Sequence, residues 1–229
     1  MSLPVRGPLG VIVVAAGTGT RFGAADKALF PLAGMPLIEH SLRLFQAEPT
    51  VAQIVAVFGE HTLERGAMLL AALRLRDASV TVGGATRGAS VRAGLHALDP
   101  DIHFVAVHDA ARPLVTRELF TTVVAAARRH GAAIPALPVT DTIVEVGENG
   151  LIRSTLSRPA LRAVQTPQVM LRAWLDEALA SNLDATDEGS LLHQAGFPVA
   201  VVPGDERNLK ITHRDDIALA ERWLQEQGT

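Results

Sequence analysis

Only two lysines occur in the 229-residue chain, Lys27 and Lys210, although lysine and arginine together number 21. The sequence uses arginine wherever a generic positive charge serves, so these two positions favour a compact ammonium over a planar guanidinium. Lys27 closes a glycine-rich loop behind the apolar run 11–16, and Lys210 follows the apolar run 198–202. Either lysine alone could be an ordinary surface residue. Because both follow strands of buried type, we interpret the pair as catalytic.

The loop that ends at Lys27 has glycines at positions 17, 19 and 23. It carries one residue more before the third glycine than the dinucleotide fingerprint, which disfavours a Rossmann dehydrogenase. No Gly-Lys-Ser/Thr sequence is present, so it is not a Walker loop either. Backbone N–H groups of such a loop can still face phosphates, and Arg21 and Lys27 would add positive charge. The loop therefore predicts a phosphate site of another kind.

Other polar residues follow further apolar runs. Asp109 follows the run 103–108 and is placed to hold a Mg²⁺ ion bridged by phosphate oxygens. It is equally suited to capping the turn that follows it in the sequence. Its neighbour His108 is interpreted as structural. Ser90, behind the Gly83-Gly84 pair, is a candidate helix cap and hydrogen-bonding group. Thr186 is expected at a helix N-terminus, where it could also contact an anion.

The elements that must position these residues alternate between β-type and helical segments. Strands are predicted at 11–16, 53–58, 80–82, 103–108 and 132–137, and helices at 36–46, 63–75, 90–98 and 116–129. Strands that are apolar throughout and separated by helices predict an α/β fold with a mostly parallel sheet flanked by helices. Ligands of such sheets bind beyond the carboxyl ends of the strands. The loops that begin at Gly17, Gly83, Asp109 and Pro203 should therefore converge on one site of a single domain, residues 1–229.

One segment interrupts this alternation. Residues 140–146 and 151–156 flank the turn sequence Gly-Glu-Asn-Gly, which predicts a β-hairpin. An isolated hairpin is marginally stable in water, and this one has too few apolar side chains for a core of its own. We expect residues 139–158 to form a protruding arm that packs on a second subunit. The alternative is that the hairpin folds over its own sheet as an edge.

Composition narrows the class of protein. A net charge of −3 disfavours nucleic-acid binding by bulk electrostatics. The absence of cysteine excludes disulfides and cysteine nucleophiles, and it fits a reducing compartment. No apolar stretch approaches the roughly 20 residues that span a bilayer, and the start of the chain lacks signal-peptide character. We expect a cytoplasmic protein that binds neither nucleic acid nor membrane.

Taken together and in order, these segments resemble the 2-C-methyl-D-erythritol 4-phosphate cytidylyltransferase family of the non-mevalonate isoprenoid pathway. The resemblance is carried by residues 15–21 with Lys27, Gly83-Gly84 with Arg87 and Ser90, residues 107–113, Asp141-Thr142, residues 165–168, residues 186–188 and residues 208–212. It implies a Rossmann-like nucleotidyltransferase fold and a homodimer interlocked through the arm. It also implies CTP with Mg²⁺ or another divalent cation, and the products CDP-methylerythritol and pyrophosphate.

The resemblance also implies roles for individual residues. Arg21, Lys27 and Lys210 would act on the phosphates and the transition state, and Asp109 would hold Mg²⁺. The CTP set would be Ala15, Ala16, Gly17, Gly19, Gly84, Ser90, Asp109 and Ala110. The set for methylerythritol phosphate would be Asp109, Arg112, Thr142, Arg158, Thr166, Thr186 and Lys210, with Thr142 and Arg158 supplied by the partner's arm.

The chain departs from the family pattern at two positions. Ala85 stands where relatives often have an acidic residue, which leaves base recognition to backbone groups and Ser90. Asp26 stands where many have proline. A ribitol 5-phosphate cytidylyltransferase is the alternative enzyme, distinguished by the arm and by residues 166–190. A catalytically silent nucleotide-binding protein is the third interpretation, against which the retained Lys27, Lys210, Arg21 and Asp109 argue.

Overall fold

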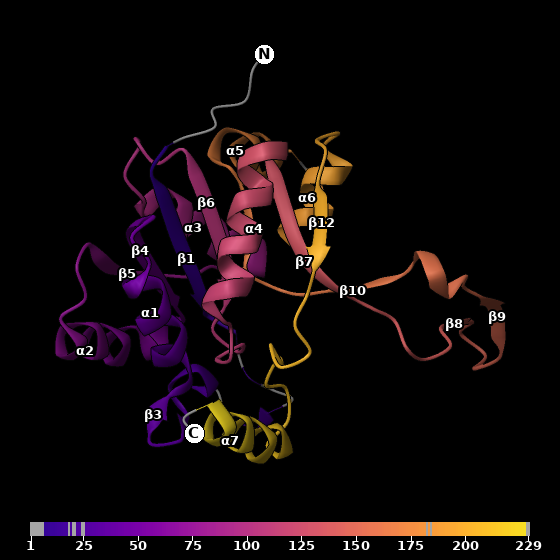
Figure 1. The fold of residues 1–229 in the computed structure, drawn as a ribbon, viewed down its shortest axis with the longest axis horizontal. Coiled ribbons are helices and arrows are strands. Elements are labelled where there is room, and N and C mark those ends of the chain that lie inside the picture. Colours follow the sequence, from indigo (N-terminus) through magenta and orange to yellow (C-terminus); the bar gives the residue numbers. More distant parts are fainter. Residues whose placement is uncertain are drawn as a thin grey trace.

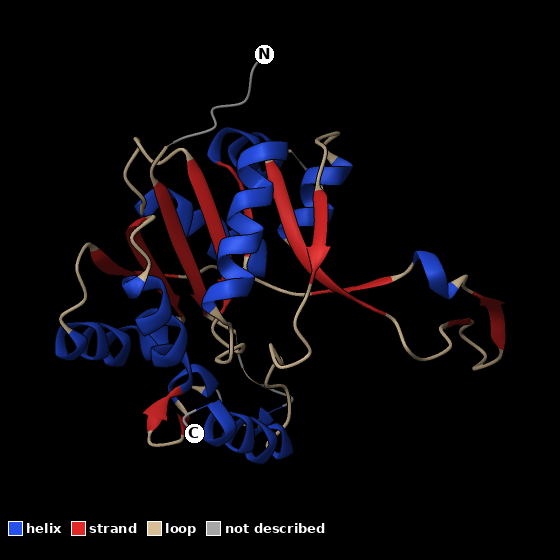
Figure 2. Cartoon of the chain, in the orientation of Figure 1, coloured by secondary structure: helices blue, strands red, loops and turns tan. Residues whose placement is uncertain are grey.

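The computed structural model describes residues 7–17, 19, 22–23, 26–181, 183 and 185–227. Within these residues an eight-stranded sheet has the order β10-β7-β11-β6-β1-β4-β5, with β12 also paired to β7 (Figures 1 and 2). Its strands are β1 (Leu9–Ala15), β4 (Val51–Phe58), β5 (Ala78–Val82), β6 (Phe104–Asp109), β7 (Ala132–Pro138), β10 (Arg162–Val164), β11 (Gln168–Leu171) and β12 (Ala200–Pro203).

Most of these strands run in one direction. β6, β1, β4 and β5 are successively parallel, and β12 is parallel to β7. β11 is antiparallel to both β6 and β7, so β7 has the same direction as β6. β10 is also antiparallel to β7. The predicted mostly parallel sheet is confirmed, whereas β10 and β11 are absent from the sequence prediction.

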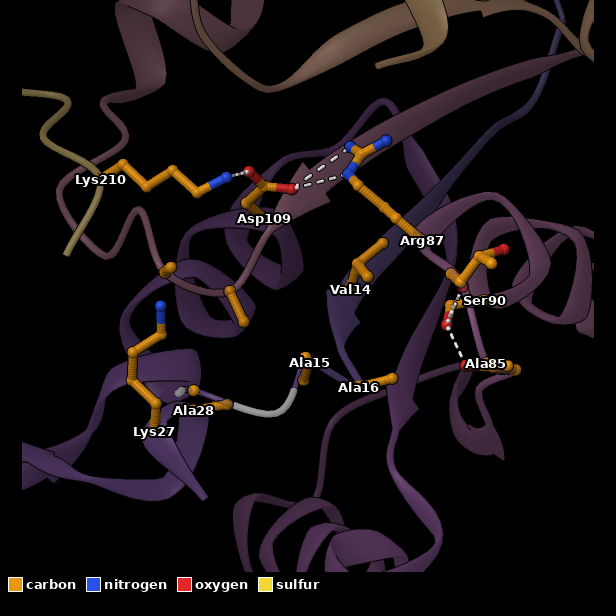
Figure 3. A pocket seen from close by; sticks show the side chains of 16 residues that line it. Val14, Ala15, Ala16, Lys27, Ala28, Ala85, Arg87, Ser90, Asp109 and Lys210 are labelled. Atoms are coloured by element: carbon orange, nitrogen blue, oxygen red, sulfur yellow. Dashed lines mark hydrogen bonds and ion pairs between the residues drawn. The ribbon is translucent and has the colours of Figure 1, made fainter. Parts of the chain in front are cut away.

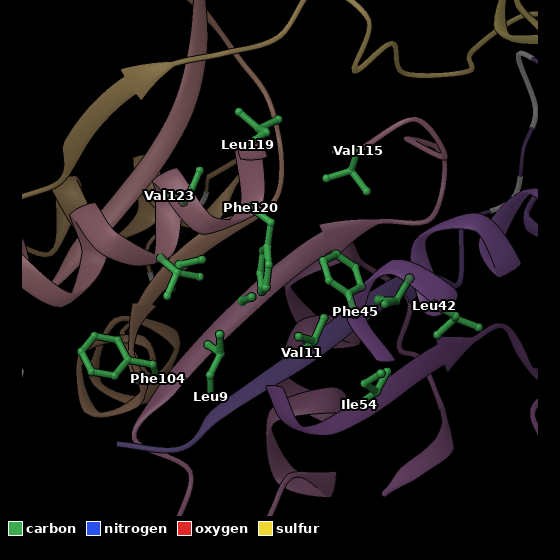
Figure 4. Packing of buried hydrophobic residues seen from close by; sticks show 14 of the residues in the cluster. Leu9, Val11, Leu42, Phe45, Ile54, Phe104, Val115, Leu119, Phe120 and Val123 are labelled. Carbon is green, nitrogen blue, oxygen red and sulfur yellow. The ribbon is translucent and has the colours of Figure 1, made fainter. Parts of the chain in front are cut away.

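Helices cover both faces of the sheet, because successive side chains of its apolar strands point to opposite faces. In β1, Leu9, Val11 and Val13 pack in one core with side chains from α1, α2 and α4, as the close view in Figure 4 shows for part of the cluster. Ile12, between them, packs in a second core with side chains from α3, α5 and α6. The helices are α1 (Leu37–Ala47), α2 (Leu63–Leu73), α3 (Arg87–Ala97), α4 (Arg117–His130), α5 (Arg172–Ala180), α6 (Glu188–Gln194) and α7 (Asp215–Gln227).

A third, smaller core lies beyond the sheet, where α7 packs beside the small ribbon of β2 (Pro31–Leu32) and β3 (Met35–Pro36) (Figure 1). Leu32, Ile211 and Ala220 are fully buried in it. The segments that carry Lys27 and Lys210 are therefore held against each other by apolar packing, although they are far apart in the sequence.

The hairpin consists of β8 (Val144–Val146) paired antiparallel with β9 (Ile152–Thr155), shorter strands than the sequence predicts. It extends away from the body of the molecule in Figures 1 and 2. Val146, Leu151 and Ile152 are exposed by 58%, 66% and 67%. The hairpin thus does not fold over its own sheet, and it leaves apolar side chains uncovered within this chain.

Two local expectations about helix ends differ in outcome. The prediction that Ser90 caps a helix is wrong, because α3 begins one turn earlier. Thr86 caps it by accepting a hydrogen bond from the backbone N–H of Ala89 at 3.0 Å, and the Ser90 hydroxyl donates to the Thr86 carbonyl at 3.0 Å. The predicted helix start at 186–188 is confirmed, with Asp187 as the cap of α6. In the described part of the chain, no helix is long and apolar enough to cross a membrane.

Candidate active site

A cavity of about 320 Å³ opens beyond the carboxyl ends of β1, β5 and β6 (Figure 3). Its walls include ten residues of the predicted site: Ala15, Ala16, Gly17, Gly19, Lys27, Gly84, Ser90, Asp109, Ala110 and Lys210. Three of the predicted loops, those after β1, β5 and β6, leave parallel strands at this edge. The fourth loop, after β12, carries Lys210 to the same cavity. The structure therefore gathers at one cavity residues that are up to 195 positions apart in the sequence.

Close backbone packing shapes one wall of the cavity. A side chain at Gly83 would place its Cβ 2.5 Å from the Cβ of Ala16 and 2.7 Å from the hydroxyl oxygen of Ser90. Gly83 is thus required for the loop after β5 to lie against the loop after β1. The Ser90 hydroxyl is bound within this wall, where it contacts the carbonyls of Thr86 and Gly84.

Asp109, at the end of β6, is the centre of a charged chain. Its Oδ2 accepts a hydrogen bond from Lys210 Nζ at 2.6 Å, and its Oδ1 lies 3.2 Å from Nη2 and 3.4 Å from Nε of Arg87 (Figure 3). The same guanidinium binds both carboxylate oxygens of Glu188. The four side chains therefore alternate in sign from Glu188 through Arg87 and Asp109 to Lys210.

Burial and the neighbouring charges shift the pKa values of the two carboxyl groups in opposite directions. Burial alone would raise the pKa of Asp109, but the adjacent Arg87 and Lys210 cations outweigh it and hold the pKa below its ordinary value. For Glu188, burial raises the pKa, and the Arg87 guanidinium only partly opposes the rise. Burial would lower the pKa of Arg87, but the two carboxylates raise it above its ordinary value. Asp109 is accordingly an ionised carboxylate at neutral pH.

Lys27 stands at the opposite wall, in a 3₁₀ turn at Lys27–Leu29. Its Nζ donates a hydrogen bond to the carbonyl of Ile211 at 2.9 Å, next to Lys210 in the sequence. Both ammonium groups therefore reach the same cavity from segments that share the third core. The arrangement presents compact positive charges to an anion in the cavity.

His108 and Thr166 support Asp109 from behind. The Thr166 hydroxyl oxygen accepts from the Asp109 backbone N–H at 3.1 Å and lies 3.2 Å from Nδ1 of His108. His108 Nε2 lies 3.1 Å from the Arg112 carbonyl, which can only accept, so Nε2 carries the proton and Nδ1 accepts from Thr166. Burial lowers the pKa of His108 to about 4. The interpretation of His108 as structural agrees with this neutral, fully engaged ring.

Several predicted substrate residues lie outside the set that lines the cavity. Arg112 is buried, with Nη1 donating to the Asn208 carbonyl at 2.7 Å, and Thr166 is also buried. Thr186 is exposed before α6. Thr142 and Arg158 belong to the arm, where Arg158 Nη1 donates to the Thr140 carbonyl at 2.6 Å. Arg21 falls outside the described residues.

The described part of the chain contains no cluster of three or more histidine, cysteine, aspartate or glutamate side chains that could hold a metal by itself. A cation in the cavity would have to share Asp109 with ligands from elsewhere. Single-carboxylate binding of this kind is common for Mg²⁺, which keeps several waters and uses substrate phosphates as further ligands.

Comparison with known proteins gives the family. A family model described as IspD, 2-C-methyl-D-erythritol 4-phosphate cytidylyltransferase, matches residues 9–226. The chain belongs to this family. The IspD protein of Symbiobacterium thermophilum, named 2-C-methyl-D-erythritol 4-phosphate cytidylyltransferase, is 40% identical over 229 residues, covering 96% of this chain and 94% of that protein. The IspD crystal structure from Thermus thermophilus, with the same name, has a TM-score of 0.77 at 34% identity and covers 95% of this chain and 99% of that one.

Some IspD relatives are longer. The bifunctional enzyme IspD/IspF of Desulfotalea psychrophila is 39% identical over 220 residues, which cover 95% of this chain. This chain spans 57% of the length of that relative. The likeness therefore extends along nearly all of this IspD family member and along about half of the bifunctional protein.

Two residues of this IspD site belong to the motifs that carry the resemblance, but the sequence prediction gives neither of them a role. Arg87 lines the cavity, and Glu188, in α6, binds the Arg87 guanidinium. The sequence feature that could have identified them is a charged residue directly after each helix cap, Thr86 for α3 and Asp187 for α6. Only the fold shows that these two helix starts, 101 residues apart, meet beside Asp109.

Proposed function

We propose that this protein transfers a cytidylyl group from CTP to 2-C-methyl-D-erythritol 4-phosphate, giving CDP-methylerythritol and pyrophosphate in isoprenoid biosynthesis. The observation that carries the proposal is the combination of a family match over residues 9–226 with a cavity that holds both lysines of the chain beside Asp109. The glycine-rich loop after β1 supports it, because backbone N–H groups there can face a triphosphate.

The proposed chemistry is an in-line displacement at phosphorus. An oxygen of the methylerythritol phosphate forms a bond to the α-phosphorus of CTP, and the bond from that phosphorus to the β-phosphate oxygen breaks with its electron pair leaving on pyrophosphate. The attacking phosphate is already an anion at neutral pH, so the step needs no general base. In agreement with this, Asp109 is the one carboxylate among the described lining residues, and its low pKa makes it a poor proton acceptor.

The role left to the protein is to position two anions and to neutralise charge as it builds up. We assign Arg21, Lys27 and Lys210 to the phosphates and to the transition state. The Lys210 ammonium has three donors, of which one is bound to Asp109, so two remain for phosphate oxygens. The backbone of Ala15, Ala16, Gly17 and Gly19 would hold the ribose and the triphosphate, and Gly84 and Ser90 would face the base.

Asp109 fits a Mg²⁺ ion as its single protein ligand. Its carboxylate is ionised, is a hard oxygen donor and borders the cavity, and the phosphates of CTP would complete the coordination together with water. Bound there, Mg²⁺ would offset negative charge on the triphosphate and on the departing pyrophosphate. Asp109 also orients Lys210, whatever the ion.

We further propose that the protein is a homodimer in which the arm, residues 139–158, crosses to the partner and brings Thr142 and Arg158 to its methylerythritol phosphate. The exposure of Val146, Leu151 and Ile152 supports this, since these apolar side chains are 58%, 66% and 67% exposed within the described part of the chain. The bond from Arg158 to the Thr140 carbonyl supports it too, because it ties together the two ends of the arm near Thr142.

The experiment for the activity measures pyrophosphate release from CTP with methylerythritol phosphate and with ribitol 5-phosphate in parallel. The proposal expects a much larger kcat/KM for methylerythritol phosphate. A preference for ribitol 5-phosphate would make this chain the alternative cytidylyltransferase, and no release with either acceptor would favour a catalytically silent nucleotide-binding protein.

The experiment for the arm mixes two inactive variants, Lys27→Ala and Arg158→Ala, after subunit exchange. If the arm acts in trans, half of the dimers are mixed and each has one intact site, so roughly a quarter of the parental activity returns. The control mixes the parent with a chain that carries both substitutions. If the arm acts in trans, no mixed dimer in this control has an intact site. If activity stays absent despite measured exchange, Arg158 serves its own chain.

A further inference from the structure

We propose that Glu188 is a positioning residue for Asp109: it anchors Arg87, so that this guanidinium holds the Asp109 carboxylate in place without neutralising it. The inference rests on the proposed role of Asp109 as a cation ligand. It assigns a purpose to a buried carboxylate that the proposed reaction does not otherwise use.

The geometry places Glu188 behind the cavity and Arg87 at its wall. Glu188 is 3% exposed and stands outside the set of described residues that line the cavity. Both of its carboxylate oxygens accept hydrogen bonds from Arg87, Oε1 from Nη1 and Oε2 from Nη2, the latter at 3.0 Å. Glu188 can therefore reach the chemistry only through Arg87.

Arg87 does not divide its contacts equally between the two carboxylates. With Glu188 it forms a bidentate pair, the strong arrangement for a guanidinium and a carboxylate. With Asp109 its two contacts are long, 3.2 and 3.4 Å, and both go to the single oxygen Oδ1. The Arg87 guanidinium thus restrains the orientation of Asp109, while its stronger hydrogen bonds are made to Glu188.

Removal of the Glu188 charge would change that division. In Glu188→Gln the Arg87 guanidinium loses its anionic partner, and the nearest remaining carboxylate is Asp109. A closer Arg87–Asp109 pair would compete with a metal ion for the same oxygens. Groups that orient a metal ligand typically contribute about 10- to 100-fold to metal affinity, so we expect a loss of this size.

Metal-free nucleotide binding should respond with the opposite sign. The Glu188→Gln cavity has one more uncompensated positive charge, so CTP without metal should bind more tightly. General damage to the fold would weaken both kinds of binding together. The difference in sign therefore separates a positioning role from a merely structural one.

The test makes two measurements. Mn²⁺ affinity is measured at saturating CTP from the free-ion signal in electron paramagnetic resonance. The affinity for metal-free CTP is measured by calorimetry in the presence of a chelator. The matched control is Glu48→Gln, which also removes a buried, arginine-paired carboxylate, here bound to Arg117 Nε at 2.7 Å. We expect weaker Mn²⁺ binding in Glu188→Gln alone. The double variant Glu188→Gln/Arg87→Gln should regain part of the lost Mn²⁺ affinity. The competing cation is gone, although its restraint on Asp109 is lost with it, and replacing both members of a buried pair is better tolerated than breaking it.

Each outcome decides the matter. Parental Mn²⁺ affinity in Glu188→Gln, or no recovery in the double variant, overturns the inference while leaving the proposed function intact. If the parent and Asp109→Asn bind Mn²⁺ equally at saturating CTP, Asp109 is not a metal ligand, and both the inference and the metal part of the proposed function are wrong.

Discussion

Replacing Lys210 by arginine keeps the positive charge and removes the compact ammonium. In the structure, Lys210 Nζ holds Asp109 Oδ2 at 2.6 Å, while the planar guanidinium of Arg87 already lies against Oδ1. A second guanidinium at position 210 would meet Asp109 with a rigid planar fork. The Lys210 ammonium leaves two rotatable donors for the phosphates, whereas a guanidinium bound to Asp109 would not.

The expected size of the effect differs between catalysis and stability. Loss of one donor to charge that develops in the transition state typically costs about 10²–10³ in rate, or about 3–4 kcal/mol. The Lys210 side chain is 41% exposed, so its ion pair is screened and its loss should change the free energy of unfolding by only about 1 kcal/mol or less. Turnover should therefore fall far more than stability.

The assay compares kcat for pyrophosphate release with the free energy of unfolding for the parent and Lys210→Arg. The control is Arg207→Lys, the reverse exchange three residues away, where the guanidinium forms an exposed pair with Glu226 at 3.6 Å. Near-parental turnover in Lys210→Arg would refute the reasoning that this site requires an ammonium. An equal loss in Arg207→Lys would show that the loop as a whole, and not its lysine, is sensitive.

Three further predictions follow from the same geometry. Asp109→Asn should raise the Mg²⁺ concentration needed for half-maximal activity and lower turnover far more than it lowers the melting temperature; a parental Mg²⁺ titration would make Asp109 a turn cap. Gly17→Ala should leave the fold intact, since a Cβ there meets no described atom within 4 Å. It should nevertheless weaken CTP binding, because the backbone would approach phosphate at this position. Calorimetry measures the CTP affinity, and thermal unfolding checks that the fold is intact. Burial lowers the pKa of His108 from 6.5 to about 4. Between pH 6.5 and pH 4 the His108 imidazole is therefore protonated in the unfolded chain and neutral in the folded one. The free energy of unfolding should for this reason fall by about 3 kcal/mol from pH 7 to pH 4. His108→Asn should flatten that decline in denaturant titrations across this range, and an unchanged slope would show that another group causes it.

The sequence was most informative where local pattern and fold agree. Apolar runs such as 11–16 and 53–58 predict buried parallel strands, and each strand appears within two residues of its expected ends. The carboxyl ends of such strands meet at one edge, so the convergence of Gly17, Gly84 and Asp109 follows from topology alone. The two lysines were found by composition, through their rarity in an arginine-rich chain.

Other features depend on contacts that no local pattern contains. The strand Arg162–Val164 is short and exposed, and it exists because it pairs with β7. Ser90 was predicted to cap α3, and the structure places the cap four residues earlier, at Thr86, whose side chain accepts a hydrogen bond from the Ala89 N–H. Arg87 and Glu188 are ordinary first-turn residues in the sequence, and their pairing is a product of tertiary structure.

The central claim is attack by the acceptor's phosphate on the α-phosphorus of CTP, and one labelling experiment tests it most directly. Methylerythritol phosphate with ¹⁸O in its phosphate is incubated with CTP, and the products are followed by ³¹P nuclear magnetic resonance. If the acceptor's phosphate attacks, all label remains in CDP-methylerythritol, with one labelled oxygen bridging the two phosphorus atoms, and pyrophosphate carries none. Label in pyrophosphate, or formation of CMP and pyrophosphate with unchanged methylerythritol phosphate, would contradict it.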